Sequence, residues 1–399
     1  MLFFKLLQVA IGCRRELLQI PTPEEWGELY ALAQKQTLVG IAFRGVELLP
    51  EAQRPPKPLL MQWYMATERI KALNTDLDRK ALAVANKFLE EGFPGMVLKG
   101  QGIAQLYRVE QIDNEQLTID NDHPEGEFSI FNSHFSIKEY RTPGDIDIWL
   151  HGARKDILRY VRRHVPDCKP VYHHVDFPVI EGLDIEVHFT PSWMNSPFTN
   201  RRLQQWFRSF NSQTVPLFIE GRVEQCGAEG VTSEARSENN TDLPSPSLTF
   251  NRVYILVHIY RHLFHEGIGL RQLLDYYFVL HQGFTEEERV ETMRTLRSLR
   301  MGRFAGAVMW VLQEVYGMDD RYLLTPPDER EGRFLLSEIM LAGNFGQYDE
   351  RMQHERGESA LHWGLRKVKR NFRFVRSYPS EVLWSPIFKL WHWVWRKTI

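Results

Sequence analysis

The sequence predicts an α+β fold in which a mixed sheet lies between helical regions at the two ends of the chain. Two observations support this prediction. Short apolar strands that carry acidic residues are confined to the middle of the chain, and apolar residues recur at helical spacing on both sides of them. The chain therefore divides into an N-terminal helical region at 1–92, a mixed-sheet core at 93–222, a polar linker at 223–247 and a C-terminal helical domain at 248–399.

The composition limits the classes of protein to consider. With 399 residues, of which 43% are hydrophobic, the chain can bury a substantial core. Its net charge of -2 argues against bulk binding of nucleic acid, for which a strongly basic domain is expected. The three cysteines, Cys13, Cys168 and Cys226, lack a CxxC spacing and indicate a reducing compartment without structural zinc. The first apolar run is too short to span a bilayer and no cleavage site follows it, so we expect a cytoplasmic protein.

The N-terminal region is expected to be helical. Pro21 and Pro23 begin a helix at PTPEEWGELYALAQ, since proline fits the first turn of a helix. A stripe that includes Ala81, Val84 and Phe88 gives the last helix of the region an apolar face. We therefore expect this unit to pack beside the sheet.

A strand that ends in a glycine turn opens the core. The apolar residues 96–98 break at Lys99 and Gly100 into a helix. A glycine at this place lets backbone N–H groups approach a phosphate at the start of the helix. Lys99, Gly100 and Gln101 are thus candidate substrate-binding residues. The alternative is a plain turn with a surface lysine.

An acidic segment separates this turn from the next strand. It lies between Tyr107 and Arg141, and its QLTID and EFSIF strings alternate in polarity as the strands of a hairpin do. We expect an extra hairpin within 109–139, with a solvated acidic surface that takes no part in phosphate binding.

The stretch GDIDIWL, residues 144–150, is the most informative part of the sequence. On a strand, Asp145 and Asp147 point to one face and the apolar residues point to the other. Two carboxylates so close together repel each other unless a cation or hydrogen-bond donors compensate, and a divalent ion with bound phosphates would do so. Gly144 and Arg141, which precede the pair, are candidate substrate-binding residues. A solvated polar face is the alternative.

A third carboxylate lies on a later strand. A helix at 153–165 is followed by two apolar strands around a Glu-Gly turn. The second strand, LDIEVHF, places Asp184, Glu186 and His188 on one face, so that an acid is available to join the Asp pair. His188 is either a donor beside Glu186 or a strand histidine without a functional role.

Helical periodicity returns after the linker. NRVYILVHIYRHLFHEG predicts an amphipathic helix, and GIGLRQLLDYYFVLHQG predicts the next one. Arg271 lies one turn before Asp275, so its guanidinium either pairs with that carboxylate or binds triphosphate oxygens. His258, His262 and His265 share one helix face at a spacing that can also bind zinc.

The C-terminal tract combines basic and aromatic residues. Arginines and lysines crowd residues 365–377, and Trp384, Trp391, Trp393 and Trp395 follow. Such a tail either packs its indoles on the domain, which we favour, or makes a weak contact with a membrane surface.

Taken in order, these motifs resemble those of a known superfamily. The order of strand, glycine turn, helix, Asp-x-Asp strand, helix and acid-bearing strand is similar to that of the nucleotidyltransferase (DNA polymerase beta-like) superfamily. The strings VLKGQGIAQLY, RTPGDIDIWL, DIEVHFTPSWM and HIYRHLFHEGIGLRQLLD together resemble an uncharacterised bacterial family of nucleotidyltransferases. One departure is Lys99-Gly100-Gln101-Gly102, which stands where the superfamily commonly has Gly-Gly or Gly-Ser. Lys99 or Gln101 would therefore replace the usual hydroxyl donor to the triphosphate.

The resemblance implies transfer of a nucleoside monophosphate from a nucleoside triphosphate, such as ATP, to a hydroxyl acceptor that the sequence does not identify. It implies Mg²⁺ held by Asp145, Asp147 and Glu186, with one ion holding the triphosphate and a second activating the acceptor hydroxyl. Two alternatives from other classes stay open. One is a catalytically inactive nucleotide-binding or scaffold protein, and the other is a metallohydrolase that uses the three histidines of the predicted helix with the Asp pair.

Overall fold

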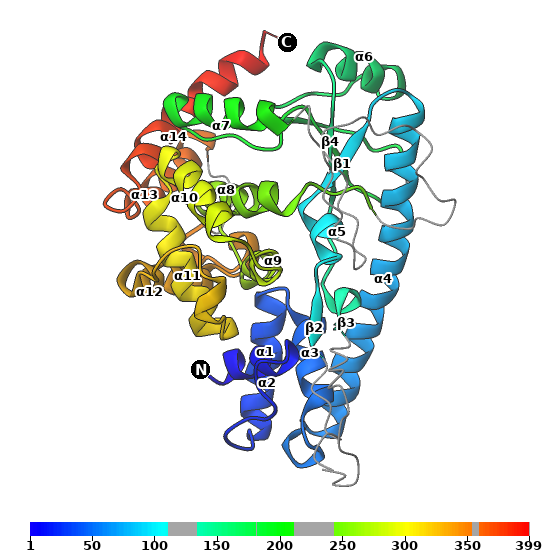
Figure 1. The fold of residues 1–399 in the computed structure, drawn as a ribbon, viewed down its shortest axis with the longest axis vertical. Helices are drawn as coiled ribbons and strands as arrows, with labels where there is room; N and C mark the ends of the chain where they lie inside the picture. The colour runs from blue at the N-terminus through cyan, green and yellow to red at the C-terminus, as the bar shows by residue number, and fades with distance from the viewer. Residues whose placement is uncertain (111–133, 181, 211–242, 353–358, 399) are drawn as a thin grey trace, which may run out of the picture.

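The computed structural model describes residues 1–110, 134–180, 182–210, 243–352 and 359–398. The hairpin predicted from QLTID and EFSIF and most of the predicted linker, residues 223–242, lie outside the described residues. Within the described residues the fold is mixed α/β and mostly helical, with a small mixed sheet (Figure 1). This architecture agrees with the α+β prediction.

The chain begins with helices, as predicted. They are α1 (Leu2–Ala10), α2 (Pro23–Lys35), α3 (Val39–Leu48) and α4 (Lys57–Glu90), with the 3-10 turn η1 (Glu51–Gln53) before α4. The predicted start of α2 is confirmed. The Thr22 hydroxyl accepts a hydrogen bond from the Glu25 N–H, and the Glu25 carboxylate accepts one from the Thr22 N–H. This reciprocal cap fixes where the helix begins.

A four-stranded sheet follows, in the order β1-β4-β6-β5. Its strands are β1 (Gly95–Leu98), β4 (Ile146–Leu150), β5 (His174–Asp176) and β6 (Ile185–His188). The central strands β4 and β6 are parallel to each other, and each pairs with an antiparallel neighbour at an edge of the sheet.

Short elements connect these strands. They are α5 (Lys99–Ala104) after β1, the 3-10 turn η2 (Lys138–Tyr140) before β4, and α6 (Arg154–His164) after β4. A separate antiparallel pair, β2 (Arg108–Glu110) and β3 (His134–Ser136), lies at the two ends of the segment in which the extra hairpin is predicted.

The two faces of the sheet differ because side chains alternate along each strand. Ile146, Ile148 and Leu150 of β4 belong to a buried cluster with Phe88 of α4 and Ile157 of α6. Helices α4 and α6 therefore cover the apolar face, and the long α4 runs along one side of the molecule (Figure 1). The acids at the alternate positions are left on the opposite face.

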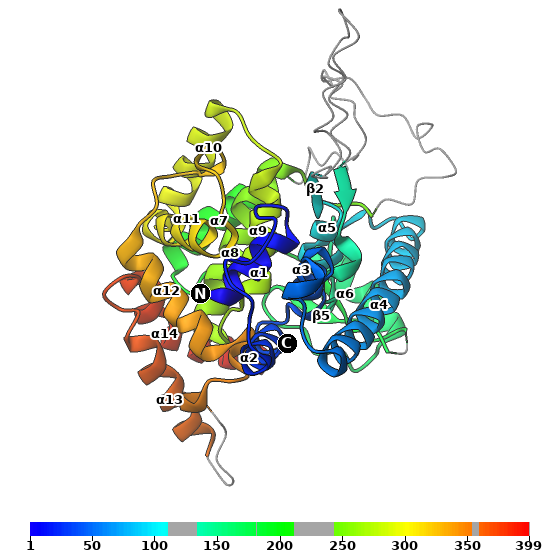
Figure 2. The same cartoon turned by 90° about the horizontal axis from the view of Figure 1, so that it is seen from below.

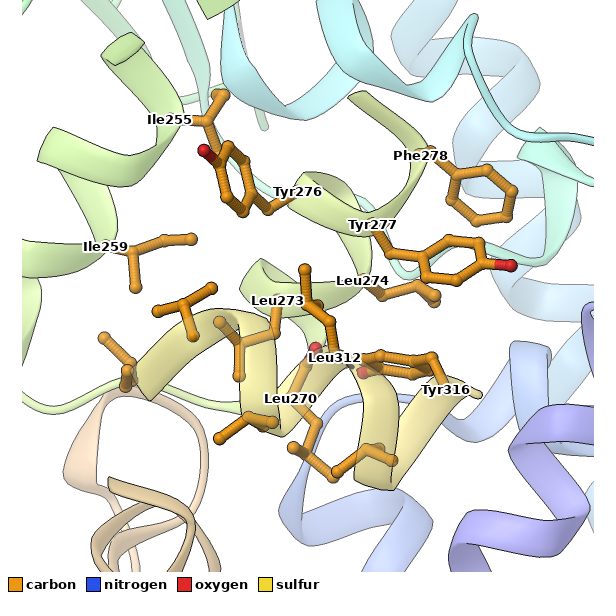
Figure 3. Packing of buried hydrophobic residues seen from close by; sticks show 14 of the residues in the cluster. Ile255, Ile259, Leu270, Leu273, Leu274, Tyr276, Tyr277, Phe278, Leu312 and Tyr316 are labelled. Atoms are coloured by element: carbon orange, nitrogen blue, oxygen red, sulfur yellow. Dashed lines mark hydrogen bonds between the residues drawn. The ribbon is translucent and has the colours of Figure 1, made fainter. Parts of the chain in front are cut away.

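The rest of the described chain is helical. Its helices are α7 (Pro197–Phe210), α8 (Leu248–His265), α9 (Leu270–His281), α10 (Glu286–Ser298), α11 (Gly302–Tyr316), α12 (Glu329–Ala342), α13 (Ala360–Phe372) and α14 (Pro379–Arg396), with 3-10 turns η3 (Asp320–Tyr322), η4 (Asn344–Gly346) and η5 (Glu350–Met352). Helices α8 and α9 are buried on nearly all sides, so the amphipathic prediction for them is wrong. The physical reason is that α9 packs against α5, α8 and α11 together, and apolar side chains of α8, α9 and α11 point toward one another (Figure 3).

The N-terminal and C-terminal helices share one hydrophobic core. Phe3 of α1 and Val46 of α3 are buried in the same cluster as Leu312 of α11, and α1 lies beside α11 (Figure 2). Helix α4 joins this core to the sheet, because it contributes Trp63 to the shared core and Phe88 to the cluster under the sheet. The N-terminal region thus packs beside the sheet as predicted and also against the C-terminal helices.

The last residues of the predicted linker are packed. The Pro244 carbonyl oxygen accepts a hydrogen bond of 2.7 Å from the Val97 N–H of β1. The fully buried Ser245 hydroxyl donates to the Gly102 carbonyl oxygen at 3.0 Å. Residues 243–247 therefore belong to the folded core, and the predicted linker boundary at 247 is too late.

Helix α14 buries only one of its sides. Glu381 and Val382 are buried, whereas Trp391 is 45% exposed and Trp393 is 57% exposed. The Trp391 ring still contacts the domain, at 5.8 Å from the ring centroid of Tyr172, so the prediction that the indoles pack on the domain is wrong for Trp393. Among the described helices, none is both long and apolar enough to cross a bilayer.

Candidate active site

The register of the sheet gathers the predicted acids on one face. Asp147 of β4 and Glu186 of β6 are direct partners across the parallel pair. On the other side of β6, Asp176 is the partner of Glu186 and His174 is the partner of His188. Because side chains alternate along a strand, these groups lie on the face opposite to the apolar cluster. Glu186 is therefore next to Asp147, where the sequence predicts a third carboxylate.

Lys99 lies against the two aspartates. Its Nζ is 3.1 Å from Oδ2 of Asp145 and 2.8 Å from Oδ2 of Asp147. Burial alone would lower the pKa of the Lys99 ammonium, but the charges of the two carboxylates raise that pKa above its ordinary value. The Asp147 side chain is 1% exposed and that of Asp145 is 37% exposed, so solvent reaches the pair from the Asp145 side.

The turn that carries Lys99 has an unusual backbone. Lys99 has a φ of 37° and Gly100 has a φ of 43°, in the left-handed region that glycine tolerates and lysine does not favour. The helix that follows packs closely on β1, because a Cβ at Gly102 would lie 2.2 Å from the Val97 carbonyl oxygen. The predicted glycine turn is present, but its lysine contacts the acids, whereas the prediction assigns it to phosphate.

His188 bridges Asp147 and Glu186. Its Nε2 is 2.8 Å from Oδ1 of Asp147 and 3.3 Å from Oε2 of Glu186. Burial opposes the charged imidazole, but hydrogen bonds to the two carboxylates raise the pKa of His188 to about 9. For Glu186 burial acts in the opposite direction and would raise the pKa. The hydrogen bond from His188 and the neighbouring positive charges nevertheless lower the pKa of Glu186 to about 2. Of the two predicted roles of His188, a donor beside Glu186 matches this geometry.

Gln101 faces away from the acids. Its Nε2 donates to Oδ1 of Asp78 at 2.5 Å and lies 3.4 Å from Oδ1 of Asn74, both on α4. The first turn of α5 directs this side chain toward α4, and the cavity beside the acids is lined by Lys99 without Gln101. The structure thus gives Gln101 a packing contact in place of the predicted phosphate contact.

Arg141 is engaged in a buried ion pair. Its Nε and one terminal nitrogen donate to the two carboxylate oxygens of Asp275 at 2.7 and 2.8 Å. The Tyr107 hydroxyl donates to the same carboxylate at 2.6 Å. Asp275 is therefore the partner of Arg141, and the alternative of an Arg271–Asp275 pair within the helix is wrong.

Arg271 is left to face the acid side of the sheet. It donates to the backbone oxygens of Thr142 and Pro143 at 3.0 and 3.3 Å. The guanidinium lies over Gly144, because a Cβ there would be in ordinary van der Waals contact with it at 3.7 Å. Burial, followed by the charge of Arg141, lowers the pKa of Arg271 to about 10.

A cavity of about 800 Å³ separates the acid face from the C-terminal helices. It brings together several of the predicted site residues, namely Lys99, Gly144, Asp145, Glu186 and Arg271. The buried Asp147 lies behind Asp145 and Lys99 rather than in the cavity wall.

Two further residues of the wall, Arg261 and Phe345, are missed by the sequence. Arg261 donates to Nε2 of His262 at 2.8 Å, and its guanidinium lies 4.2 Å from the ring centroid of Trp193. Arg261 lies within the HIYRHLFHEG string, which could have marked it as a site residue. The sequence alone does not show which side of that helix lies against the cavity. Phe345 has a φ of 50° in the turn η4, and its ring lies 5.4 Å from that of His262. No local pattern indicates it.

The histidines of α8 do not form a metal centre. His262 donates through Nδ1 to Oε2 of Glu266 at 2.9 Å, and Nε2 of His265 lies 3.3 Å from Oδ1 of Asn195. Burial and the charge of Arg261 lower the pKa of His262 to about 4. Within the described part of the chain, the side chains that converge closely enough to bind a metal ion do not include these histidines. The metallohydrolase alternative therefore finds no support.

The acid face does carry groups of side chains that could share a cation. They are Asp147 with Glu186 and His188, His174 with Asp176 and Glu186, and His173 with His174 and His188. In each group the ligand atoms lie within 4.8 Å of one another. Carboxylate oxygens and imidazole nitrogens are metal ligands, so the residues present fit a divalent cation.

Comparison with known proteins identifies the family of the chain. A model of a protein family described as "Uncharacterised nucleotidyltransferase" matches residues 22–111 and 136–317. These ranges contain the glycine turn, both acid strands and helices α8 and α9. No curated protein and no solved structure gives a significant match. The match to the family model covers most of the chain, which therefore belongs to this family of uncharacterised nucleotidyltransferases.

Proposed function

We propose that the chain transfers a nucleoside monophosphate from a nucleoside triphosphate, such as ATP, to an acceptor hydroxyl, on a core of the polymerase beta-like kind. The observation that carries the proposal is the pairing of opposite charges across one cavity. Asp145 and Glu186 lie on the sheet side, and Arg261 and Arg271 lie on the helical side. A triphosphate complexed with a divalent cation complements both walls at once.

The two arginines support the phosphate part of this proposal. Among the described residues, no carboxylate forms an ion pair with Arg261 or Arg271, and the Nε of each is buried without a hydrogen-bond partner. Burial lowers the pKa of both guanidinium groups, which shows that each is desolvated without full compensation. Phosphate oxygens would supply the missing acceptors, since guanidinium groups bind them through charge-assisted hydrogen bonds.

The acids support the metal part. Asp145 and Asp147 offer only oxygen atoms, the ligand type that Mg²⁺ prefers, so we assign Mg²⁺ to this pair. Divalent cations held by Asp145, Asp147 and Glu186 would neutralise the charge of the phosphates and would lower the pKa of the acceptor hydroxyl. The acceptor oxygen forms a bond to the α-phosphorus, the bond to the bridging oxygen breaks, and pyrophosphate leaves.

The residues of the chain then have separate tasks. Arg261 and Arg271 orient the phosphates, and Lys99 balances the charge of the Asp pair. Glu186 is poorly suited to accept the hydroxyl proton, because its pKa is lowered to about 2. Asp184, which is exposed at the wall of the same cavity, is the candidate for that role.

The test is transfer of label from α-labelled nucleoside triphosphates to molecules of a cell lysate. Asp147→Asn keeps the shape of the side chain and removes its charge, so transfer should fall by about two orders of magnitude or more. The buried Lys99 and His188 lose their counter-charge in this variant, so its melting temperature should also fall, and transfer is measured below that temperature. Asp145→Asn, at a side chain that is 37% exposed, should lose transfer with a smaller effect on stability. Asp156→Asn is the matched control, because Asp156 forms an ion pair with Arg159 on α6, away from the site.

Two outcomes would count against the proposal. Wild-type transfer by Asp147→Asn would remove Asp147 from the site. Nucleotide binding by the wild type without turnover of any triphosphate would instead identify the scaffold alternative.

A further inference from the structure

The two oxygens of the Asp147 carboxylate have different partners. Oδ2 is 2.8 Å from Nζ of Lys99, and Oδ1 is 2.8 Å from Nε2 of His188. Oδ2 therefore faces the side of Asp145, and Oδ1 faces β6. A cation held by the Asp pair through Oδ2 and a cation held through Oδ1 would lie in different places.

Nitrogen as well as oxygen surrounds the second of these places. Nε2 of His188 and Nδ1 of His174 lie 3.3 and 3.2 Å from the same atom, Oε2 of Glu186. The sheet register fixes this arrangement, because His174 faces His188 across the β5–β6 pair while Asp147 faces Glu186 across the β4–β6 pair. We call the four side chains the Glu186 cluster: Asp147, His174, Glu186 and His188. A cation bound by Nε2 of His188 would replace the proton that this atom donates to the two carboxylates, and that proton would be released to solvent.

Asp176 supports the cluster from outside. Its side chain is 78% exposed, and its Oδ1 lies 3.6 Å from Nε2 of His174, the ring nitrogen that points away from Glu186. A carboxylate at that nitrogen is the usual device that orients a ligating imidazole and raises its basicity. At 3.6 Å the Asp176 carboxylate adds negative charge beside the His174 ring without a hydrogen bond, so Asp176 supports cation binding at the edge of the cluster.

The mixed donor set indicates a different class of cation from the Asp pair. Mg²⁺ prefers oxygen ligands and keeps several of its waters, whereas imidazole nitrogen favours first-row transition metals. We propose that the Glu186 cluster binds a first-row transition-metal ion in preference to Mg²⁺, and Mn²⁺, the weakest binder of that series, serves as the paramagnetic probe. This inference rests on the proposed function in one respect, because the cluster would supply the second cation of the same transfer site.

The experiment measures metal binding by the full-length protein without nucleotide. Mn²⁺ is titrated and its free concentration is followed by electron paramagnetic resonance, and Mg²⁺ is then added as a competitor. We expect one Mn²⁺ per chain at the cluster, bound at least about tenfold more tightly than Mg²⁺. His188→Gln and His174→Gln should each weaken Mn²⁺ binding by about tenfold or more.

His164→Gln is the matched control, because His164 of α6 contacts the Tyr160 carbonyl oxygen, and it should bind Mn²⁺ as the wild type does. Since His188 is buried, the half-buried His174 is the variant that decides the result if His188→Gln does not fold. Equal affinities for Mn²⁺ and Mg²⁺, or unchanged Mn²⁺ binding by His174→Gln, would overturn the inference and leave the histidines as hydrogen-bond donors. A chain that binds Mn²⁺ in this way but transfers no nucleotide would keep the metal site and refute the proposed function.

Discussion

Arg141 forms two hydrogen bonds with Asp275, and Tyr107 donates a third to the same carboxylate. Both charges are buried, so each depends on the other for hydrogen bonds that water would supply in the unfolded chain. The pair connects the segment before β4 to helix α9. It therefore fixes the strand that carries the acids to the helical core.

This pair gives the first prediction. Asp275→Asn leaves the Arg141 guanidinium buried without its counter-charge, and such a change destabilises a protein by about 3–5 kcal/mol. The midpoint of urea unfolding should fall accordingly. Asp76→Asn is the control, because Asp76 forms an exposed ion pair with Lys80 and should change the midpoint little. Equal midpoints for the two variants would show that the Arg141–Asp275 pair does not stabilise the fold.

Single residues could be predicted where the strand period alone determines their position. Side chains alternate between the two faces of a sheet along each strand, and this period places Asp145, Asp147 and Glu186 on the same face. The structure has them there. The partner of Arg141 could not be predicted, because the ion pair joins segments that meet only through tertiary packing. The sequence places Gln101 at the phosphate for the same reason, because no local pattern shows that α4 lies beside this side chain.

At the scale of elements, Glu381 holds α14 against the start of α7. Its carboxylate accepts hydrogen bonds from the N–H groups of Asn195 at 2.7 Å and Ser196 at 3.4 Å. A negative charge is favourable at the N-terminus of a helix. Burial nevertheless has the larger effect, and it raises the pKa of Glu381 to about 7 although these hydrogen bonds lower it.

The second prediction is a pH dependence of stability. The folded-state pKa of Glu381 lies above its ordinary value of 4.5, so the stability from the protonated form is fully present below pH 4.5 and is lost as the pH rises through about 7. Glu381→Gln removes this titration and should flatten the thermal stability profile between these values. The difference should reach about 3 kcal/mol at most. Parallel profiles for the two proteins would show that the pKa of Glu381 is not raised in the folded protein.

The third prediction concerns the exposed side of α14. Trp393 lies beneath the exposed Lys397, whose Nζ is 3.6 Å from its ring centroid, and an exposed indole beside a basic residue suits the surface of an anionic bilayer. Wild-type protein should cosediment weakly with vesicles that contain phosphatidylglycerol, and Trp393→Ser should bind less without a change in melting temperature. Vesicles of neutral lipid are the control. Equal sedimentation of both proteins with both vesicles would exclude this contact.

Elements with local signals could be predicted, and elements set by packing could not. The start of α2 follows from Pro23, and the Thr22–Glu25 cap that the structure adds also acts within one turn. Helical periodicity also finds α8 and α9, but periodicity describes one apolar face. Periodicity does not show that other helices cover the remaining faces of α8 and α9. The position of Arg261 in the cavity wall therefore cannot be predicted from the sequence.

At the scale of the whole molecule, two hydrophobic cores are joined by α4. One core lies under the sheet, and the other combines helices from both ends of the chain. The sequence predicts helical regions at both ends of the chain. It does not predict that they pack against each other, because neither segment carries a sequence pattern that identifies its distant partner. The cavity lies between the sheet and this second core, so the positions of Arg261 on α8 and Arg271 on α9 depend on how the helices of that core pack.

The fourth prediction follows from the shared core. Deletion of residues 1–49 removes α1, α2 and α3 and uncovers the apolar side of α11. The shortened chain should melt more than about 5 °C below the wild type, and it should aggregate on size-exclusion chromatography. A monomeric shortened chain with an unchanged melting temperature would show that the N-terminal helices are an independent unit.

The contact of Lys99 with Asp145 and Asp147 makes cation uptake at this pair an exchange reaction. The pair already holds the monovalent ammonium of its own chain, at 2.8 Å from Asp147, on a backbone that lysine does not favour. A divalent ion that binds the pair must displace that ammonium. Its measured affinity therefore reports how much more strongly the pair binds the divalent ion than it binds the ammonium of Lys99. A bare ion leaves the displaced ammonium without a partner, whereas an ion that arrives with a triphosphate brings a new one. We therefore expect the divalent ion and the triphosphate to bind to the site cooperatively.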